Sequence, residues 1–422
     1  MFTTDTAHPW KVWEKIVFRF LFLFLGFYLL NYELVFISFD FNFYDVLSKI
    51  YESVAQPLYW LDTHFYHTGY DPKFHQAVPG DNHFGVVFYF TVIIICILSV
   101  IAWSVIDRHK TQYNKLNYWF RLYVRYMVAL IMFGYGIDKL IPVQMSYPGV
   151  TELLTPFGDQ GLFSTVWNFI GASPGYEIFT GACEVIGSLL LIFRRTYVFG
   201  SLFMCTILCN VVALNIFYNI PVKLYSSLLL VCVLFLLLPY AYKLIQFFFY
   251  GRAVSLAEKH YKFERSWKKY LVIILGIGIP VAGVLNDLFH VNKRYQENQV
   301  ISKRQKLYDV TYFVTSDTLP PLLTDTLRWK RFALAYKNSA VIYSMQDKAD
   351  YYDCDIDTVK HTYTLHNDAD TSTWKIFHYS NPQKNVLQLS GTWKGSDVNI
   401  LMNEMSIDSI TLNKERLIFL QD

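Results

Sequence analysis

Long apolar stretches separated by polar segments recur along the first two thirds of the chain. Windows long enough to cross roughly 30 Å of hydrocarbon lie at 13–38, 85–106, 121–141, 175–193, 196–219, 222–240 and 270–290. A transmembrane helix needs about 20 mostly apolar residues, and each of these windows comes close to that length. The pattern therefore predicts an α-helical multi-pass membrane protein with about seven transmembrane helices.

Lys and Arg are unevenly distributed over the segments that flank these windows. The basic clusters are Lys11, Lys15 and Arg19; Arg108, Lys110, Lys115, Arg121 and Arg125; Arg194 and Arg195; and the lysines and arginines from Lys243 to Lys269. Segments 40–84 and 142–174 are poor in both residues. Because cytoplasmic loops carry an excess of Lys and Arg, we expect an inner-membrane protein with a cytoplasmic N-terminus and a periplasmic C-terminal segment.

From about residue 305 the pattern changes to short strand-like runs separated by turn residues. The runs lie at 310–315, 332–336, 340–344, 357–365, 373–379, 386–393, 398–402 and 409–412. Short strands at this spacing predict a C-terminal antiparallel β barrel or sandwich. Cys354 is the single cysteine of this segment, so its stability must come from its own core rather than from an internal disulfide.

Composition agrees with a membrane protein that carries an attached soluble domain. The chain is 53% hydrophobic and 17% charged, and its net charge is +3. The basic residues stand at predicted helix ends, and no nucleic-acid-binding motif is present, so we expect membrane lipid and no nucleic acid as a partner.

The predicted outer segment 40–84 begins with apolar residues at helical spacing over 44–61, which indicates a helix lying along the membrane interface. His64 and His67 follow at a spacing that suits a shared metal ion, and acidic residues stand nearby. A polar, aromatic outer loop has the same composition. His64 and His67 are therefore the weakest candidate site, and we assign no metal.

A lysine and a glutamate interrupt two consecutive predicted spans. Lys139 stands near the end of the third window, and Glu184 near the middle of the fourth. Because a charge at mid-membrane costs about 2.5–3.5 kcal/mol, the two should face each other or a wet cavity. Gly181 and Gly187 flank Glu184, which lets a neighbouring helix or a ligand approach closely. We assign Lys139 and Glu184 as the candidate catalytic residues, with an interhelical ion pair as the structural alternative.

Other polar residues fall in the outer half of the predicted bilayer or at its rim. The candidate ligand-binding residues are Asp138, Asp159, Asn210, Asn215 and Lys223. The two asparagines would orient a ligand, and the three charged residues would form the rim. Segment 142–174, which joins the third and fourth spans, is either a capping loop over this cluster or an ordinary interfacial loop.

Short motifs in the membrane part resemble the DoxX-like integral membrane protein family. They are Gly136-x-x-Lys139, Glu184-x-x-Gly187, and Leu189-Leu190-Leu191 running into Arg194-Arg195-Thr196. The resemblance covers about residues 117–240 and implies a four-helix core. Family members resemble subunits of quinone-linked oxidoreductases, which implies a quinone or quinol as the ligand. Where the family often has a second glycine, this chain has Ser188.

A looser similarity links the chain to vitamin K-dependent carboxylase-like membrane proteins, in which a helical bundle with charged residues precedes a β-rich outer domain.

Together the patterns divide the chain into four parts. These are a two-span unit with an outer interfacial helix and loop (1–116), the DoxX-like core (117–240), an inner amphipathic connector with the seventh span (241–304), and an extracytoplasmic β-domain (305–422).

The leading functional hypothesis is an outer-facing polar cavity in the membrane that binds a small amphipathic ligand, as in a quinone-linked oxidoreductase subunit. The alternative is a non-enzymatic membrane scaffold whose β-domain binds an envelope protein partner, the buried charges being structural. A transporter ranks last, because the spans lack matching Pro/Gly-broken helices in two halves.

Overall fold

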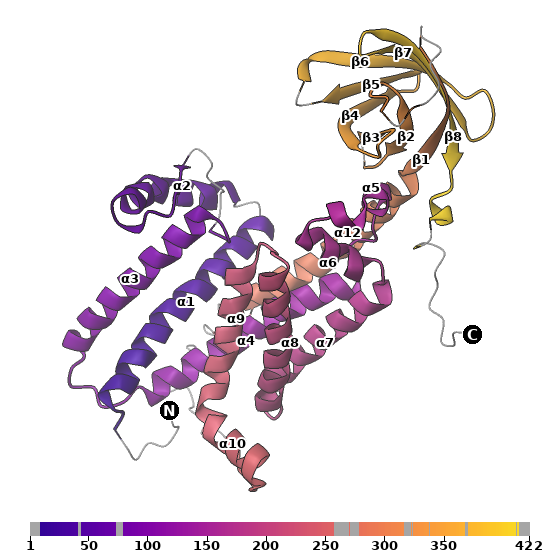
Figure 1. Cartoon of the computed structure of the whole chain (residues 1–422). Helices are drawn as coiled ribbons and strands as arrows, with labels where there is room; N and C mark the ends of the chain where they lie inside the picture. The colour runs from indigo at the N-terminus through magenta and orange to yellow at the C-terminus, as the bar shows by residue number, and fades with distance from the viewer. Residues whose placement is uncertain are drawn as a thin grey trace. The chain divides into compact units, whose positions relative to one another are not determined.

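The computed structural model describes residues 9–40, 44–72, 79–256, 270, 278–315, 322, 324–336, 338–367, 370–410 and 412. The chain forms two compact units (Figure 1). The first unit comprises Met1–Ile141 and Gly175–Asn292, and the second comprises Pro142–Pro174 and Lys293–Asp422. The second unit therefore includes segment 142–174, which lies between two membrane helices in the sequence.

The first unit is helical. Its elements are α1 (Val12–Asp40), α2 (Tyr44–Leu61), η1 (Asp62–Tyr66), α3 (His83–Ile106), α4 (Asn114–Leu140), α7 (Pro174–Ile192), α8 (Tyr197–Phe217), α9 (Lys223–Leu237), η4 (Leu238–Tyr240) and α10 (Ala241–Tyr250). Helix α12 (Ile279–Arg304) begins in this unit and continues into the second.

Within the residues that the structure describes, five helical segments are long and apolar enough to cross a membrane, which indicates a membrane protein. They are His83–Ile106, Asn114–Leu140, Pro174–Ile192, Tyr197–Phe217 and Lys223–Tyr250, and they coincide with the second to sixth predicted windows. Helix α3 leaves Ile94, Leu98, Ile101 and Val105 exposed along one face. An apolar face of this length fits contact with lipid tails rather than with water.

The first and seventh predicted windows are not among these five segments. Helix α1 covers the whole first window. Residues 257–269 and 271–277 lie outside the described residues, and they include the later part of the predicted connector and about a third of the seventh window. Helix α12 covers the second half of that window and runs on to Arg304.

Large apolar and aromatic side chains of α1, α4, α8 and α9 form the core of the helical unit. Phe18, Leu25, Val124, Leu208 and Leu229 are fully or almost fully buried in one cluster. Helices α8 and α9 are apolar on nearly all sides, which is typical of membrane-spanning or fully buried helices. The bundle thereby fixes the positions of the polar residues that lie between its helices.

Helix α2 confirms the predicted helix at 44–61, and it packs through Tyr51, Ala55 and Leu58. Asp62, which follows it, accepts hydrogen bonds from the backbone N–H groups of Thr68, Gly69 and Tyr70 and from the Thr68 hydroxyl, at 2.7–3.1 Å. Burial opposes ionisation, but these donors together hold the pKa of Asp62 below its ordinary value. The carboxylate therefore has a structural role in shaping this turn.

The second unit contains a closed eight-stranded antiparallel barrel (Figure 1). Its strands are β1 (Lys306–Val314), β2 (Trp329–Leu334), β3 (Ser339–Ser344), β4 (Ala349–Asp357), β5 (Thr362–Asn367), β6 (Asp370–Ser380), β7 (Val386–Trp393) and β8 (Ser396–Met405). Each strand pairs with the next, and β8 pairs with β1, for example Leu307 with Met405. Of the two predicted alternatives, the barrel is confirmed.

Aromatic side chains fill the interior of the barrel. Phe332, Phe377 and Trp393 are almost completely buried, and the rings of Trp329 and Trp393 meet edge to face at 5.1 Å. Small eight-stranded barrels are commonly filled by their own side chains in this way. The two-residue turn Lys394–Gly395, with φ of 48° and 84°, joins β7 to β8 as a tight hairpin.

Two of the predicted strand boundaries were wrong. The sequence pattern predicts one strand over 357–365, but this run contains the end of β4, a turn and the start of β5. The pattern also predicts a strand over 409–412, whereas a short 3-10 helix, η6 (Ile407–Ser409), occupies the beginning of this run. Most of β4 was missed because its outward positions carry aspartates, which are depleted in strands.

Segment 142–174 packs against the barrel within the second unit. It contains α5 (Val150–Leu154), η3 (Phe157–Asp159) and α6 (Leu162–Gly171). Val150 is buried in a cluster with Leu307 and Val341, and its N–H donates to the Gln305 side chain at 3.1 Å. The Tyr336 hydroxyl donates to Glu152 at 3.3 Å. The segment that joins α4 to α7 thus belongs to the same compact unit as the barrel.

Cys354 is expected to resist thiol reagents until the barrel unfolds. Its side chain is 3% exposed, and burial, together with the nearby Asp355 carboxylate, raises the pKa of its thiol to about 12. Because the thiolate is the reactive form, a maleimide at neutral pH should label Cys354 only after denaturation. Peptide mapping of the labelled full-length protein measures this, and rapid labelling of the folded protein would contradict the packing of β4.

Candidate functional site

Lys139 and Glu184 form an ion pair between α4 and α7. The Lys139 Nζ lies 2.6 Å and 2.7 Å from the two carboxylate oxygens of Glu184. Lys139 is 8% exposed and Glu184 is 2% exposed. Of the two arrangements that the sequence allowed, charges that face each other or charges that face a wet cavity, the structure has the direct pair. A pair with both oxygens engaged is strong and geometrically defined.

Two glycines bring the backbones of α4 and α7 together one turn before the charges. A Cβ atom at Gly181 would lie 2.7 Å from the Gly136 carbonyl oxygen and 2.7 Å from the Lys139 Cβ. A Cβ at Gly136 would lie 2.9 Å from the Gly181 carbonyl oxygen. Each helix therefore presents a glycine and, three residues later, a charged residue to the other. This close crossing sets the short distance between Lys139 and Glu184.

Gly187, the other glycine beside Glu184, faces a different helix. A Cβ there would meet the terminal methyl group of Met204 on α8 at 2.8 Å. Helices rather than a ligand therefore occupy the small surfaces on both sides of Glu184. A second carboxylate, Glu177, lies two turns earlier on the same face of α7 and is fully buried.

The other candidate ligand-binding residues are dispersed. The Asn215 amide donates to the Ser226 hydroxyl at 2.9 Å, which joins α8 to α9. Asn210 is exposed on α8, and Asp138 is half-buried at the end of α4. Lys223 lies 3.9 Å from Asp81, whose carboxylate also accepts from the backbone N–H groups of Lys223 and Leu224. Asp159 is exposed in η3 of the second unit.

His64 lies in η1, and His67 directly follows it. No group of three or more His, Cys, Asp or Glu side chains in the part of the chain that the structure describes is arranged to hold a metal ion. The His64 ring stacks on Trp60 at 4.6 Å, and its Nδ1 lies 2.8 Å from the Trp60 carbonyl oxygen. His67 has a positive φ of 54° and ends the turn after α2.

Sequence reasoning missed several residues that shape this region. Gly136 was noted only as part of a motif, and its contact with Gly181 depends on how the helices cross. Asp81 lies 142 residues from Lys223, so no local pattern predicts that it caps α9. Arg121 and Arg125 were counted as topology signals, although their positions inside an apolar helix marked them as buried charges.

Comparison with known proteins gives one informative match. No family model matches the chain, and no solved structure matches it. The resemblance to the DoxX-like family therefore stays a prediction. Over 113 residues the chain is 33% identical to the uncharacterized protein YwoB of Bacillus subtilis (strain 168). The aligned region is 27% of this chain and 71% of YwoB. Because the similarity extends over most of YwoB, the two share more than a local motif, and the chain belongs to the same family as YwoB.

Proposed function

We propose that the protein is a membrane protein that binds a small, neutral amphipathic molecule at Lys139 and Glu184. The ion pair between two membrane helices is the observation that carries this proposal. Ionisable residues within membrane helices are costly and mark functional sites by default. An ion pair is also a poor way to stabilise a bundle, because apolar residues of similar volume usually do as well or better.

The chemistry of the pair specifies the ligand. Lys139 offers donors only, and a Glu184 carboxylate offers acceptors only. Together they carry no net charge, so a charged ligand would leave an uncompensated charge in a low dielectric. The expected ligand is therefore neutral, with an acceptor for Lys139 and a donor for Glu184 at one end of an apolar body.

A quinone or quinol meets these requirements. The carbonyl oxygen of a quinone would accept from Lys139, and the hydroxyl group of a quinol would donate to Glu184, which would then act as a proton acceptor. The same ligand follows from the DoxX-like resemblance. We accordingly propose a role as the membrane subunit of a quinone-linked oxidoreductase, in which a partner subunit supplies the redox centre.

The distribution of Lys and Arg along the sequence supports one orientation in the membrane. We propose seven spans in the inner membrane, with the N-terminus in the cytoplasm and the barrel in the periplasm. Lys139 and Glu184 would then lie in the outer half of the bilayer.

Titrations of the detergent-solubilised full-length protein with a short-chain quinone and with the corresponding quinol test the proposal. Saturable binding is expected in the wild type and in Lys115→Met, which removes an exposed lysine at the other end of α4, about 36 Å away. Glu184→Gln is expected to weaken quinol binding roughly tenfold or more, because it removes the charged acceptor. Equal quinol affinity in the wild type and in Glu184→Gln would contradict the proposal, as would absence of saturable binding of both ligands.

One observation favours the scaffold as a second candidate. Trp374 and Ile376 are 63% and 53% exposed at alternate positions of β6, so an aromatic and an aliphatic side chain face outward next to each other. In that case an envelope protein would bind the barrel, and Lys139 and Glu184 would only hold α4 against α7. The same titration separates the two candidates, because a scaffold would bind no quinone.

A further inference from the structure

A pocket lined by three arginines opens at the end of the helical unit where α4 begins. Its volume is about 220 Å³, and its lining residues are Tyr118, Arg121, Leu122, Arg125, Tyr126, Arg194, Tyr197 and Leu236. These residues come from α4, from the link between α7 and α8, from the start of α8 and from the end of α9. Arg125 precedes Lys139 on α4 by roughly 21 Å along the helix axis, so this pocket is separate from the site proposed above.

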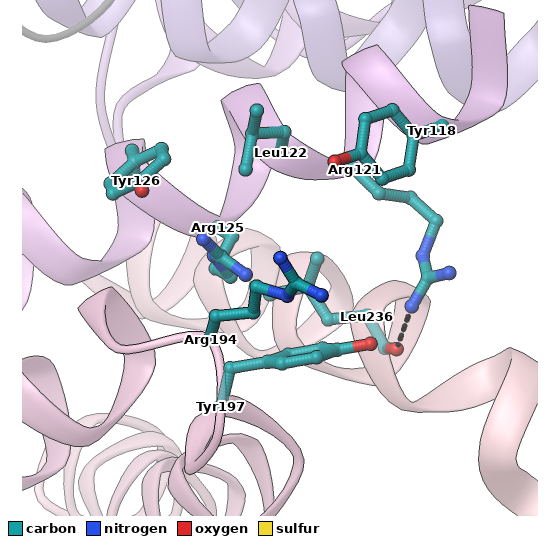
Figure 2. Close-up of a pocket in the computed structure, with 8 residues that line it drawn as sticks. All are labelled: Tyr118, Arg121, Leu122, Arg125, Tyr126, Arg194, Tyr197 and Leu236. Atoms are coloured by element: carbon teal, nitrogen blue, oxygen red, sulfur yellow. Dashed lines mark hydrogen bonds between the residues drawn. The ribbon is translucent and has the colours of Figure 1, made fainter. Parts of the chain in front are cut away.

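The three arginines approach this space from different elements. Figure 2 shows the Arg125 and Arg194 guanidinium groups pointing toward the same space, and Arg121 reaching the Leu236 carbonyl oxygen, to which it donates at 2.9 Å. None of the eight lining residues is acidic. The pocket therefore has a strong excess of positive charge at a place where the surrounding helices exclude much of the water.

Arg125 is the most informative of the three. It is 6% exposed, yet no acceptor hydrogen-bonds its Nε among the described residues. Its guanidinium group instead lies over the rings of Tyr126 and Tyr197, with centroid distances of 4.8 Å and 5.1 Å. Aromatic faces stabilise a cation only partly, and a buried polar group normally has hydrogen-bond partners.

Another buried arginine in the same unit, Arg19, has hydrogen-bond acceptors and serves as a comparison. Arg19 is 4% exposed, and its guanidinium group donates to the Tyr113 hydroxyl at 2.7 Å and 3.1 Å and to the Ser104 hydroxyl at 2.7 Å. Tyr113 in turn donates to the Asp107 carboxylate. Arg19 thus has acceptors and a linked anion, whereas Arg125 has aromatic rings.

We propose that this pocket binds the phosphate group of an anionic ligand. Guanidinium groups match phosphate oxygens in charge and geometry. Because the arginines approach the pocket from different elements, the ligand needs hydrogen-bond acceptors on several sides, and a phosphate group has them. The volume is below the roughly 300–1,000 Å³ of most small-molecule sites, so it admits a headgroup-sized anion. The phosphate belongs either to an anionic phospholipid, which basic pockets between membrane helices recognise, or to a soluble phosphate ester.

Thermal unfolding of the full-length protein tests the proposal with two probes. The lipid probe is a phosphatidylcholine nanodisc with or without phosphatidylglycerol, and the soluble probe is glycerol 1-phosphate added to the detergent-solubilised protein. Binding to the folded state raises the unfolding temperature. A rise with phosphatidylglycerol alone identifies a phospholipid, whereas a rise with glycerol 1-phosphate identifies a soluble phosphate ester. Either result supports a phosphate site.

Adjacent arginines provide a matched control. Arg194→Gln removes a lining guanidinium group, and Arg195→Gln removes the same charge from the next residue, which does not line the pocket. Arg194→Gln and Arg125→Met are expected to weaken binding roughly tenfold to a hundredfold, and Arg195→Gln to leave it unchanged. Because Arg194 is exposed, its variant should fold even if Arg125→Met does not. No rise with either probe, or equal losses in Arg194→Gln and Arg195→Gln, would overturn the proposal.

Discussion

Lys139→Met is expected to destabilise the full-length protein by about 3–5 kcal/mol. The substitution leaves the Glu184 carboxylate, which is 2% exposed, without the ammonium group that now contacts both of its oxygens. A charge left alone in a low-dielectric bundle costs far more than the pair itself contributes. Thermal unfolding of the detergent-solubilised variant measures the loss.

A second lysine of the helical unit supplies the control for this substitution. Lys223 lies 3.9 Å from Asp81, and its side chain is 34% exposed, so Lys223→Met should cost less than about 1 kcal/mol. The Asp81 carboxylate would still accept from the backbone at the start of α9. If Lys139→Met and Lys223→Met lowered the stability by the same small amount, water would have to solvate Glu184. That result would contradict the burial of the ion pair.

Gly181→Ala is expected to cost roughly 1–3 kcal/mol and to weaken ligand binding. The new methyl group would meet the backbone of α4 at the Gly136 carbonyl oxygen and the Leu140 nitrogen, at 2.7 Å and 2.8 Å. Backbone atoms cannot move aside, so α4 and α7 must separate, and the contact between Lys139 and Glu184 must lengthen. Thermal unfolding and quinone titration of the variant measure the two effects.

Gly187→Ala is the matched control on the same helix. Its methyl group would meet only the flexible end of Met204 and neighbouring side chains, which can shift. Alanine also has a higher helix propensity than glycine, by up to about 1 kcal/mol, so this variant should be neutral or slightly more stable. Equal losses in the two variants would show that the α4–α7 crossing is not the sensitive contact.

Local sequence patterns predicted the helices and strands that depend mainly on the residues within them. The apolar windows located α3, α4, α7, α8 and α9, and alternation and turn residues located most strands of the barrel. Strand β4 escaped because Asp350, Asp353 and Asp355 interrupt it, and only its neighbours in the sheet make these exposed positions part of a strand. The docking of Val150 against the barrel joins residues far apart in sequence, and no pattern carries that information.

The candidate site shows the same division. The cost of a charge in a membrane helix predicted that Lys139 and Glu184 would face either each other or a wet cavity, and the structure has them facing each other. That cost was not enough to predict where Asn210, Asn215 and Lys223 lie. Asn215 bonds Ser226, Lys223 lies beside Asp81, and Asn210 is exposed. Tertiary partners of this kind are decided by helix crossings rather than by helix sequences.

Quinone binding by the double variant Lys139→Met/Glu184→Leu tests the central claim most directly. Because the double variant removes both charges together, its thermal stability should return to within about 1 kcal/mol of the wild type. A ligand site predicts that this stable protein no longer binds the short-chain quinone. If the double variant is as stable as the wild type and binds the quinone with unchanged affinity, the pair only holds the helices together, and the proposed function is wrong.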